Sequence, residues 1–530
     1  MKKIVWLIVS MVVLVFLIGL LRYGPADGVK LNLSAAAVAL LNRTASDEIP
    51  KNITVHNIEI EPARWDSLVS QLPESRELKV KAKYIRNGIK YPVRIKIRGN
   101  LALHWTSPKK SIRLYFSGKS PFGNIKQVNF VNPKTYHIIN NNISMWLGNQ
   151  VGMNTVYDKL VFLVINGEKY GLMEMMEQPN GRYERARNLS DSKVPVYKGD
   201  YIPEGDTVIL SENVWESHLN WVYKGDVENS ESLEVLEKLV NVINSDTVLE
   251  NNYGKLEEYI DIDEFIRYYA GLRILNTVHI DQTHNQVIVY NSRKGKFYPV
   301  LWDPTMMWPA QRDNNFYMIY DALAYLVLSN PKWREQRDQI IYEICKEFHS
   351  SGRLYDKMDK EVAVIREAVY LDHNKSNPIT NNLDDVFRFS NGHFEWSYWK
   401  LKKACKVHFE ELLNDIQFNR VKVVEEENSL HIKYTTNVPL EVRLEFDGEK
   451  EDSVKVDFSD SMIQIVKQDK SEIILKLFGM IEHIDGVNAN RYSVSRCYLK
   501  KEHSLALNLN QSVHKVTIYN AITGQEIKQE

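Results

Sequence analysis

Three polar residues near the middle of the chain have the types and the order that phosphoryl transfer requires. Asp281 and Asn285 precede a short apolar run, and Asp303 follows a second one. An Asp can orient or deprotonate an acceptor hydroxyl, while an Asn and a second Asp can hold magnesium on nucleotide phosphates. Asp and Asn also solvate strand ends and cap turns, and this structural role accounts for most of them in sequences of this kind.

The segment that carries these residues is predicted to be a β-hairpin. Residues 287–289 and 298–302 alternate apolar side chains with others, and a Lys/Gly turn near Arg293–Lys296 separates them. Because a hairpin brings its outer ends together, we expect Asp281, Asn285 and Asp303 to converge at one mouth. His284 belongs to the same polar cluster before the first strand.

Composition points to several globular domains and argues against a nucleic-acid partner. The chain has 530 residues, of which 44% are hydrophobic and 25% charged, so two or three domains with ordinary cores are expected. A net charge of −1 gives no basic field to attract nucleic acid. Cys345, Cys405 and Cys497 do not resemble a disulfide framework or a zinc site, which needs clustered ligands, and are expected to be structural free thiols.

The N-terminus carries a segment able to reach across a membrane. Lys2 and Lys3 precede Ile4–Leu21, an uncharged run that spans roughly 27 Å as a helix at about 1.5 Å per residue. Residues 1–22 are therefore expected to be a transmembrane anchor or, alternatively, a cleaved signal, with residues 23–50 as a tether. The basic flank places the body outside the cytoplasmic membrane, either anchored by one span or secreted.

Residues 51–417 are predicted to form an α+β domain. Strands are expected at Leu78–Ile85, Val93–Ile97 and Ile112–Phe116, followed by a hairpin that turns at Asn166-Gly167, a strong two-residue turn signal. Later helical patterns run from residue 263 to 276 and, in several pieces, from 318 to 415.

From residue 418 to 530 the pattern changes to short, regularly spaced strands. This spacing is typical of a separate β-sandwich, which we expect to fold on its own and to bind an envelope partner rather than take part in catalysis. The expected strands are Val421–Val424, Leu430–Tyr434, Leu440–Phe446, Val454–Phe458, Ile473–Leu477, Tyr492–Leu499, Leu505–Leu509 and Val516–Tyr519.

A second group of candidate residues lies between 98 and 113. Lys109 and Lys110 stand next to the strand that begins at Ile112, after a Gly-containing loop. A kinase needs a cation on the nucleotide phosphates, and a strand lysine held by a glutamate supplies it; Glu177, at the end of its own strand, could be that glutamate. The alternative is that these lysines are solvated strand charges.

Five motifs in order make the chain resemble the CotH family of atypical secretory-pathway kinases, first associated with bacterial spore coats. The resemblance covers roughly residues 75–310, and extends to 415 with the trailing helices. The motifs are Arg98-Gly99-Asn100 with His104-Trp105 and Pro108-Lys109-Lys110-Ser111, then Asn132-Pro133-Lys134-Thr135, Ile165-Asn166-Gly167-Glu168 to Glu177-Gln178, Val196-Tyr197-Lys198-Gly199-Asp200, and Asp281 to Trp302-Asp303-Pro304.

The resemblance implies a kinase-like fold that binds ATP with Mg²⁺ or Mn²⁺ and phosphorylates Ser or Thr hydroxyls of a protein. Asp281 matches the family's catalytic Asp, with Asn285 after it, and Asn285 and Asp303 match the metal ligands. The nucleotide-binding positions match Lys110, Lys109, Glu177 and Arg98. Alternation along the strand favours Lys110 slightly over Lys109, because it would share the face of Ile112.

Two departures from the family pattern bear on activity. Residues 101–105, Leu-Ala-Leu-His-Trp, replace the small Ser-rich loop followed by Arg that many members have. Many members also have Trp-Asp-x-Asp, whereas Pro304-Thr305 follow Asp303 here, so a second carboxylate is missing.

Three functions remain open at this point. The first is an extracytoplasmic kinase with an envelope protein as its substrate, and the second is a catalytically inactive, membrane-anchored surface or assembly protein with the same fold. The third is glycan hydrolysis by paired carboxylates, Asp281 and Asp303, which would leave Asn285 and the lysines without a role.

Overall fold

The structure is a computed structural model, and it describes most of the chain from residue 47 to residue 529. The gaps in this range are 100–103, 106, 134–137, 190–192, 200–201, 205–206, 210–212, 226–229, 246–248, 278, 284, 306–317, 320, 379–385, 389–390, 427–428, 447–462, 470, 480, 484–494, 500–502 and 509–512. The Ile4–Leu21 segment and the tether up to residue 46 lie outside the described residues. Within them, every helix is too short or too polar to cross a membrane.

The chain divides into two compact units, each built from several segments. The first unit contains the residues up to Asn142, Tyr157–Gln178 and Lys357–Lys402. The second contains Ile143–Val156, Pro179–Asp356 and Lys403–Glu530. Helices and strands are mixed in both, which is compatible with the expected α+β class.

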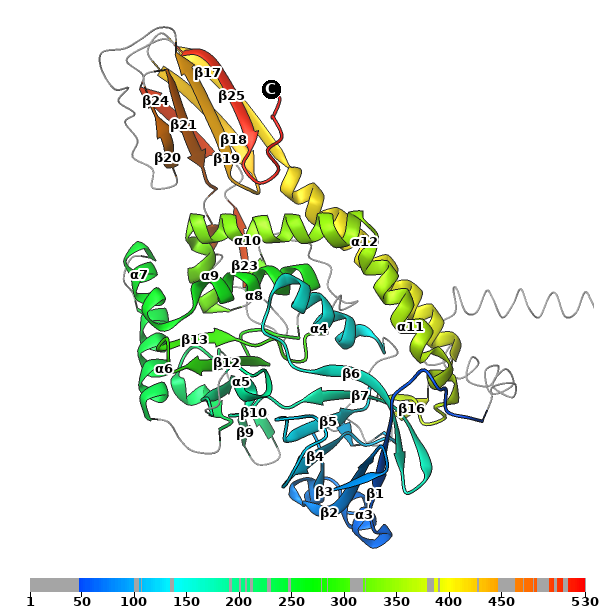
Figure 1. Ribbon diagram of the computed structural model, residues 1–530. Coiled ribbons are helices and arrows are strands. Elements are labelled where there is room, and N and C mark those ends of the chain that lie inside the picture. The colour runs from blue at the N-terminus through cyan, green and yellow to red at the C-terminus, as the bar shows by residue number, and fades with distance from the viewer. Residues whose placement is uncertain are drawn as a thin grey trace, which may run out of the picture. The chain divides into compact units, whose positions relative to one another are not determined.

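A closed β-barrel forms the centre of the first unit (Figure 1). Its strands follow one another as β1-β2-β3-β4-β5-β7-β6, and the parallel pairing of β1 with β6 closes it. The bounds are β1 Val55–Glu59, β2 Val80–Arg86, β3 Ile89–Ile97, β4 Ile112–Phe116, β5 Gln127–Val131, β6 Asp158–Ile165 and β7 Glu168–Glu177.

The sequence explains the barrel through alternation and turn chemistry. In β4, Ile112 and Leu114 are fully buried in the barrel core, while the alternate residues Arg113 and Tyr115 are half-buried. The β6–β7 hairpin turns at Asn166 and Gly167, which both have positive φ, at 53° and 83°. A two-residue turn of this kind matches the twist of the strands, and the expected hairpin is thus confirmed.

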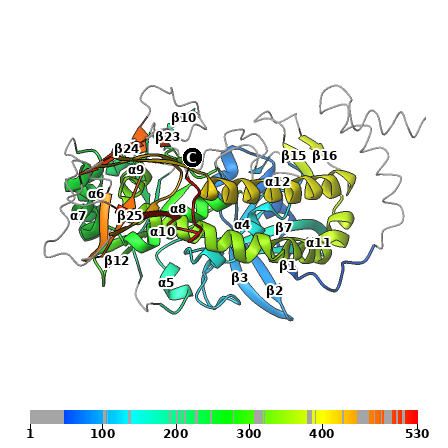
Figure 2. The same cartoon turned by 90° about the horizontal axis from the view of Figure 1, so that it is seen from above.

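Two long helices add a second layer to the first unit. Helix α11 (Arg353–Leu371) and helix α12 (Asn391–Gln417) lie side by side (Figure 2). Residues 353–356 of α11 and 403–417 of α12 are assigned to the second unit. The side chains of Arg366 and Glu395 join them with an N–O distance of 2.7 Å, and Lys402 and Asp359 do the same at 2.7 Å. The remaining elements of the first unit are α3 Pro62–Val69, η2 Glu74–Glu77, β15 Ser376–Pro378, β16 Val386–Arg388 and the start of α4 Asn140–Val151.

The second unit combines a four-stranded sheet with packed helices. The sheet has the order β11-β8-β12-β13. Its strands and the surrounding elements are α5 Tyr183–Ala186, β8 Val196–Gly199, β9 Ile202–Glu204, β10 Thr207–Ile209, η4 His218–Asn220, β11 Trp221–Tyr223, α6 Ser230–Ile243, α7 Leu249–Tyr259, α8 Ile262–Leu275, β12 Gln286–Asn291, β13 Lys296–Pro299, β14 Met318–Ile319, α9 Ala322–Ser329, α10 Pro331–Ile344 and η5 Cys345–Ser350. Cys345 and Cys405 are buried free thiols.

The C-terminal strands form two antiparallel sheets with a shared apolar core. The sheets have the orders β17-β18-β24 and β20-β21-β19-β25, and residues such as Ile432 and Leu475 are fully buried between them. The bounds are β17 Asn419–Glu426, β18 Ser429–Thr436, β19 Leu440–Phe446, β20 Ile463–Gln468, β21 Glu472–Leu477, β24 His503–Asn508 and β25 Val513–Asn520. Two further strands, β22 Ile481–His483 and β23 Ser495–Leu499, form a separate sheet with β14 in the order β14-β23-β22. The expected strand Val454–Phe458 lies outside the described residues.

The boundary expected at residue 418 falls between the end of α12 at Gln417 and the start of β17 at Asn419. Independent folding of the part that follows stays a prediction, because Lys476 also pairs with Glu335 of α10 at 2.5 Å.

We predict that a fragment of residues 418–530 unfolds cooperatively on heating, because its core is made of its own residues. Leu475→Ala in the fragment should cost about 2–5 kcal/mol, since Leu475 is fully buried. Ile465→Ala is the control, as Ile465 is 39% exposed in the same sheet. A gradual transition without a midpoint, or equal effects of the two substitutions, would contradict the prediction.

Candidate functional site

The predicted hairpin is present, and its strands are fixed within a larger sheet. Strand β12 pairs antiparallel with β13 on one side and with β8 on the other. Residues 292–295 make the turn, close to the predicted position. Since β12 is buried along nearly its whole length, the two loops that enter and leave the hairpin have little freedom.

His279 brings Asn285 and Asp303 together at the mouth of the hairpin. Its Nδ1 atom lies 2.6 Å from the backbone oxygen of Asp303, and since a carbonyl oxygen only accepts, Nδ1 carries the proton. The Nδ2 atom of Asn285 donates to the backbone oxygen of His279 at 2.8 Å. Asn285 and Asp303 therefore lie near each other, as expected, because both contact His279, a residue that the sequence pattern did not single out.

The backbone at this mouth is held in uncommon conformations. Asn285 has φ of 61° and Asp303 has φ of 50°, both in the left-handed region that Asn and Asp tolerate better than other non-glycine residues. Thr277 links the loop before β12 to the loop after β13. Its hydroxyl donates to the backbone oxygen of Pro304 and accepts from the N–H of His279 at 3.1 Å. Such local strain persists where surrounding contacts determine it, and it is common at functional sites.

Asp281 lies in the same loop but is held by different contacts. Its Oδ1 atom accepts from the backbone N–H and from the hydroxyl of Thr283, both at 2.7 Å, and the residue is only 2% exposed. Its backbone oxygen accepts from Nε2 of Gln286 at 2.9 Å. Asp281 is thus oriented within its own loop and linked through Gln286 to the start of β12. His284 lies outside the described residues.

The oxygen atoms at this mouth suit a magnesium ion that also binds phosphates. Asp303 contributes a carboxylate, and Asn285, whose Nδ2 atom is used toward His279, contributes a side-chain carbonyl. Among the described residues, no group of three or more His, Cys, Asp or Glu side chains could hold a metal alone. Magnesium commonly takes one or two carboxylates together with substrate phosphates, so the donor set fits that ion.

A buried carboxylate, Asp321, contacts this loop through Gln286. It caps helix α9 by accepting from the N–H of Ala324 at 2.8 Å, and it also accepts from Gln286 at 3.1 Å and from Tyr269 at 3.2 Å. Burial raises the pKa of Asp321 to about 6. Gln286 therefore links the Asp281 loop to Asp321.

In the first unit, Lys109 and Lys110 have different surroundings. Lys109 is 2% exposed, and its ammonium group donates to the backbone oxygen of Leu172 at 2.8 Å and pairs with the carboxylate of Asp372. Lys110 donates instead to the backbone oxygen of Ser107 at 2.7 Å, and burial lowers its pKa. Strand alternation does not apply to either residue, because β4 begins only at Ile112. The slight preference for Lys110 thus rested on a strand that does not reach it.

The carboxylate partner of Lys109 is Asp372 rather than Glu177. The described contacts of the two lysines do not include Glu177, whose Oε2 atom accepts from the N–H of Tyr157 at 3.2 Å at the end of β7. Arg98 follows β3, is 8% exposed, and donates its backbone N–H to Ser111 at 2.8 Å. Glu177 and Arg98 are therefore buried at strand ends of the barrel unit.

Sequence reasoning missed three residues of these two clusters. Asp372 is 263 positions from Lys109, so no local pattern could pair them. His279 stands two positions before Asp281, and that proximity was its only signal. Asp321 had a clearer one, because an Asp before the apolar run that starts at Ala322 is a typical helix cap.

Comparison with known proteins identifies a family. A family model described as CotH kinase protein matches residues 95–402, which is more than half of the chain, and the match includes both clusters. None of the curated proteins compared with the chain matches it.

We predict that Asp321 makes the second unit less stable as pH rises from about 4 to about 6. The carboxyl ionises near its ordinary pKa of 3.8 when unfolded but only near 6 when folded, so its favourable contribution is complete below pH 4 and is lost above 6. A difference of about two pKa units corresponds to roughly 3 kcal/mol.

Urea unfolding at pH 4 and pH 6.5 measures this effect. Asp321→Asn should reduce the loss of unfolding free energy over this range, whereas the control Asp263→Asn, at an exposed position of α8, should not. Equal pH dependence in the parent and in Asp321→Asn would show that the carboxyl titrates normally.

Proposed function

The chain belongs to the CotH kinase protein family, and on that premise we propose that it transfers the γ-phosphate of ATP to Ser or Thr hydroxyls of an extracytoplasmic or envelope protein. Family membership implies ATP-dependent phosphotransfer in general. The protein acceptor and the location outside the cytoplasm are proposed from the resemblance and from the apolar segment Ile4–Leu21.

The mouth of the β12–β13 hairpin carries this proposal. Asn285 and Asp303 meet there at His279, with hard oxygen atoms suited to magnesium on nucleotide phosphates. When bound, the ion would neutralise charge that develops on the transferred phosphate. His279 fixes the backbone of Asp303, and Thr277 fixes the loop that follows it.

Asp281 is proposed to act on the acceptor hydroxyl. Its buried carboxylate is held in one orientation by Thr283, which suits a group that must receive or direct a proton from a positioned hydroxyl. In the first unit, Lys109 is the proposed phosphate-facing lysine, because its ammonium group is buried and held by Asp372.

One observation favours a second candidate, an inactive membrane-anchored assembly protein with the same fold. Pro304 and Thr305 follow Asp303 where many members have another carboxylate. The oxygen of Pro304 is used as an acceptor for Thr277, so this part of the loop serves structure.

We predict that Asp303→Asn abolishes magnesium-dependent ATP binding and phosphoryl transfer together, because Pro304 and Thr305, which follow it in the sequence, supply no second carboxylate. Asp281→Asn should keep ATP binding and lower the rate, since its proposed partner is the acceptor. Isothermal titration with ATP and magnesium measures binding in both variants. Asp356→Asn, at an exposed position in the first turn of α11, is the matched control. Parent-like ATP binding by Asp303→Asn would reject the assignment of this hairpin and leave the assembly protein as the better account.

A further inference from the structure

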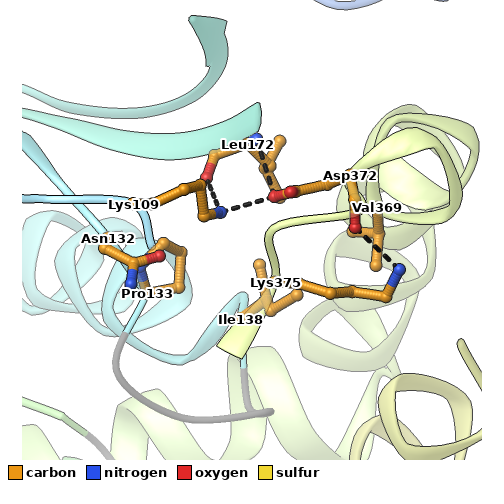
Figure 3. A pocket seen from close by; sticks show the side chains of 8 residues that line it. All are labelled: Lys109, Asn132, Pro133, Ile138, Leu172, Val369, Asp372 and Lys375. Atoms are coloured by element: carbon orange, nitrogen blue, oxygen red, sulfur yellow. Dashed lines mark hydrogen bonds and ion pairs between the residues drawn. The ribbon is translucent and has the colours of Figure 1, made fainter. Parts of the chain in front are cut away.

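A small pocket in the first unit is surrounded by two lysines and one aspartate (Figure 3). Lys109 comes from the segment before β4, and Asp372 and Lys375 come from the segment after α11. The cavity has a volume of about 10 Å³, which is space for one water-sized atom. The other lining residues are Asn132, Pro133, Ile138, Leu172 and Val369.

These three ionisable side chains leave an excess of positive charge in a buried place. Lys109 is 2% exposed and Lys375 is 5% exposed, and only Asp372, at 2%, lies beside them as a carboxylate. The pKa of Lys375 is lowered to about 8, chiefly by burial; Asp372 opposes the shift and Lys109 adds to it. Buried charges in proteins are normally paired, so a further anion is expected beside the ammonium group of Lys375.

The carboxylate of Asp372 is engaged mainly by groups other than Lys375, whose ammonium group donates to the backbone oxygen of Asp372 instead. Its Oδ2 atom accepts from Lys109 and from the N–H of Leu172 at 3.0 Å, and its Oδ1 atom accepts from the N–H of Asn374 at 2.9 Å. Gly171 makes room for this carboxylate: its φ is 127°, and a Cβ atom there would lie 2.6 Å from the carboxyl group. The side chain of Asp372 thus docks on the backbone of β7 and holds Lys109.

Hydrogen-bond donors remain available around the cavity. Lys375 uses one N–H, toward the backbone oxygen of Asp372 at 2.9 Å, and Lys109 uses two. An ammonium group has three donors, so one on Lys109 and two on Lys375 have no partner among the described residues.

Asn132 adds an independent sign that a ligand atom is expected here. It is 2% exposed, and its Oδ1 atom has no hydrogen-bond partner in the described part of the chain, while Nδ2 contacts the hydroxyl of Ser107 at 3.0 Å. A half-turn of this amide would let Ser107 donate to Oδ1 and would direct the N–H groups toward the pocket. Leaving a buried polar atom unpaired is unfavourable, and after the half-turn a bound oxyanion would accept from the N–H groups and remove that cost.

We propose that Lys375, together with Lys109, binds one oxygen of a phosphoryl group in this pocket, and that Asp372 is the residue that positions Lys109. The identification of that group with the phosphates of ATP rests on the proposed kinase function; the affinity for a phosphoryl oxyanion does not. The cavity takes a single oxygen atom, so the rest of the nucleotide lies outside it.

Inorganic tripolyphosphate is the probe, titrated calorimetrically into the full chain purified in detergent. Lys375→Met should weaken its binding at least tenfold, because a hydrogen bond from a charged donor is lost, and Lys375→Arg should retain most of the affinity. Lys90→Met is the matched control, since Lys90 is an exposed lysine of the barrel that pairs with Glu59.

The pH profile separates a ligand contact from a structural role. In the parent, affinity should fall as pH rises above 8, because burial, opposed by Asp372 and aided by Lys109, lowers the pKa of Lys375 to about 8. Lys375→Arg should fall less, because Arg stays charged, and this comparison also accounts for protonation of the probe itself. Circular dichroism checks that the variants fold.

Each outcome decides between the proposals. If the parent does not bind tripolyphosphate, or if Lys375→Met binds it like the parent, the phosphoryl site is refuted. If binding depends on Lys375 but the parent transfers no phosphate, the site stands and the kinase function fails. If the parent transfers phosphate and Lys375→Met keeps its KM for ATP, the kinase function stands and the identification of this group with the phosphates of ATP is wrong.

Discussion

The buried ion pair between Lys109 and Asp372 is the contact around which the lysine cluster of the first unit is arranged. It joins the loop before β4 to the end of α11, 263 residues later in the chain. Both side chains are 2% exposed, so loss of either partner would leave an uncompensated charge, at a cost of about 3–5 kcal/mol. Such a pair is weak evidence for stability in itself, because dehydrating two charges offsets their attraction. Its value lies in position: it fixes one lysine at a defined place on β7 and leaves a second lysine, Lys375, in need of an anion.

In the hairpin of the second unit, hydrogen bonds between neutral groups hold the functional loops in place. Asn285 and Asp303 have left-handed backbone conformations, and hydrogen bonds from Thr277 and to His279 hold the loops around them. Both clusters therefore combine a chemically useful side chain with a backbone that packing has fixed. This preorganisation is what binding and phosphoryl transfer require, since catalysis of this kind consists mostly of positioning and electrostatic stabilisation.

Local patterns predicted much of this protein, and long-range contacts could not be predicted. The β12–β13 hairpin, the turn at Asn166-Gly167 and the change to strands after Gln417 follow from alternation and turn chemistry, which act between neighbouring residues. The closure of the barrel by β1 with β6 and the pairing of Lys109 with Asp372 join distant parts of the chain, and no periodicity reports them. For the same reason, the pairing of Glu177 with a lysine was expected in place of the distant pairing of Lys109 with Asp372. The choice between Lys109 and Lys110 depended on where β4 begins, and strand ends are the least certain part of a pattern.

The central claim is that this chain, with one carboxylate at the Asp303 mouth, is an active kinase. Incubation of residues 30–530 with γ-labelled ATP, magnesium or manganese, and a generic protein acceptor tests it most directly. The account predicts label on Ser or Thr of the acceptor or of the chain itself, and strongly reduced labelling with Asp281→Asn. Labelling of the parent no greater than that of Asp281→Asn would contradict it, and would favour a protein that keeps the family's fold without its chemistry.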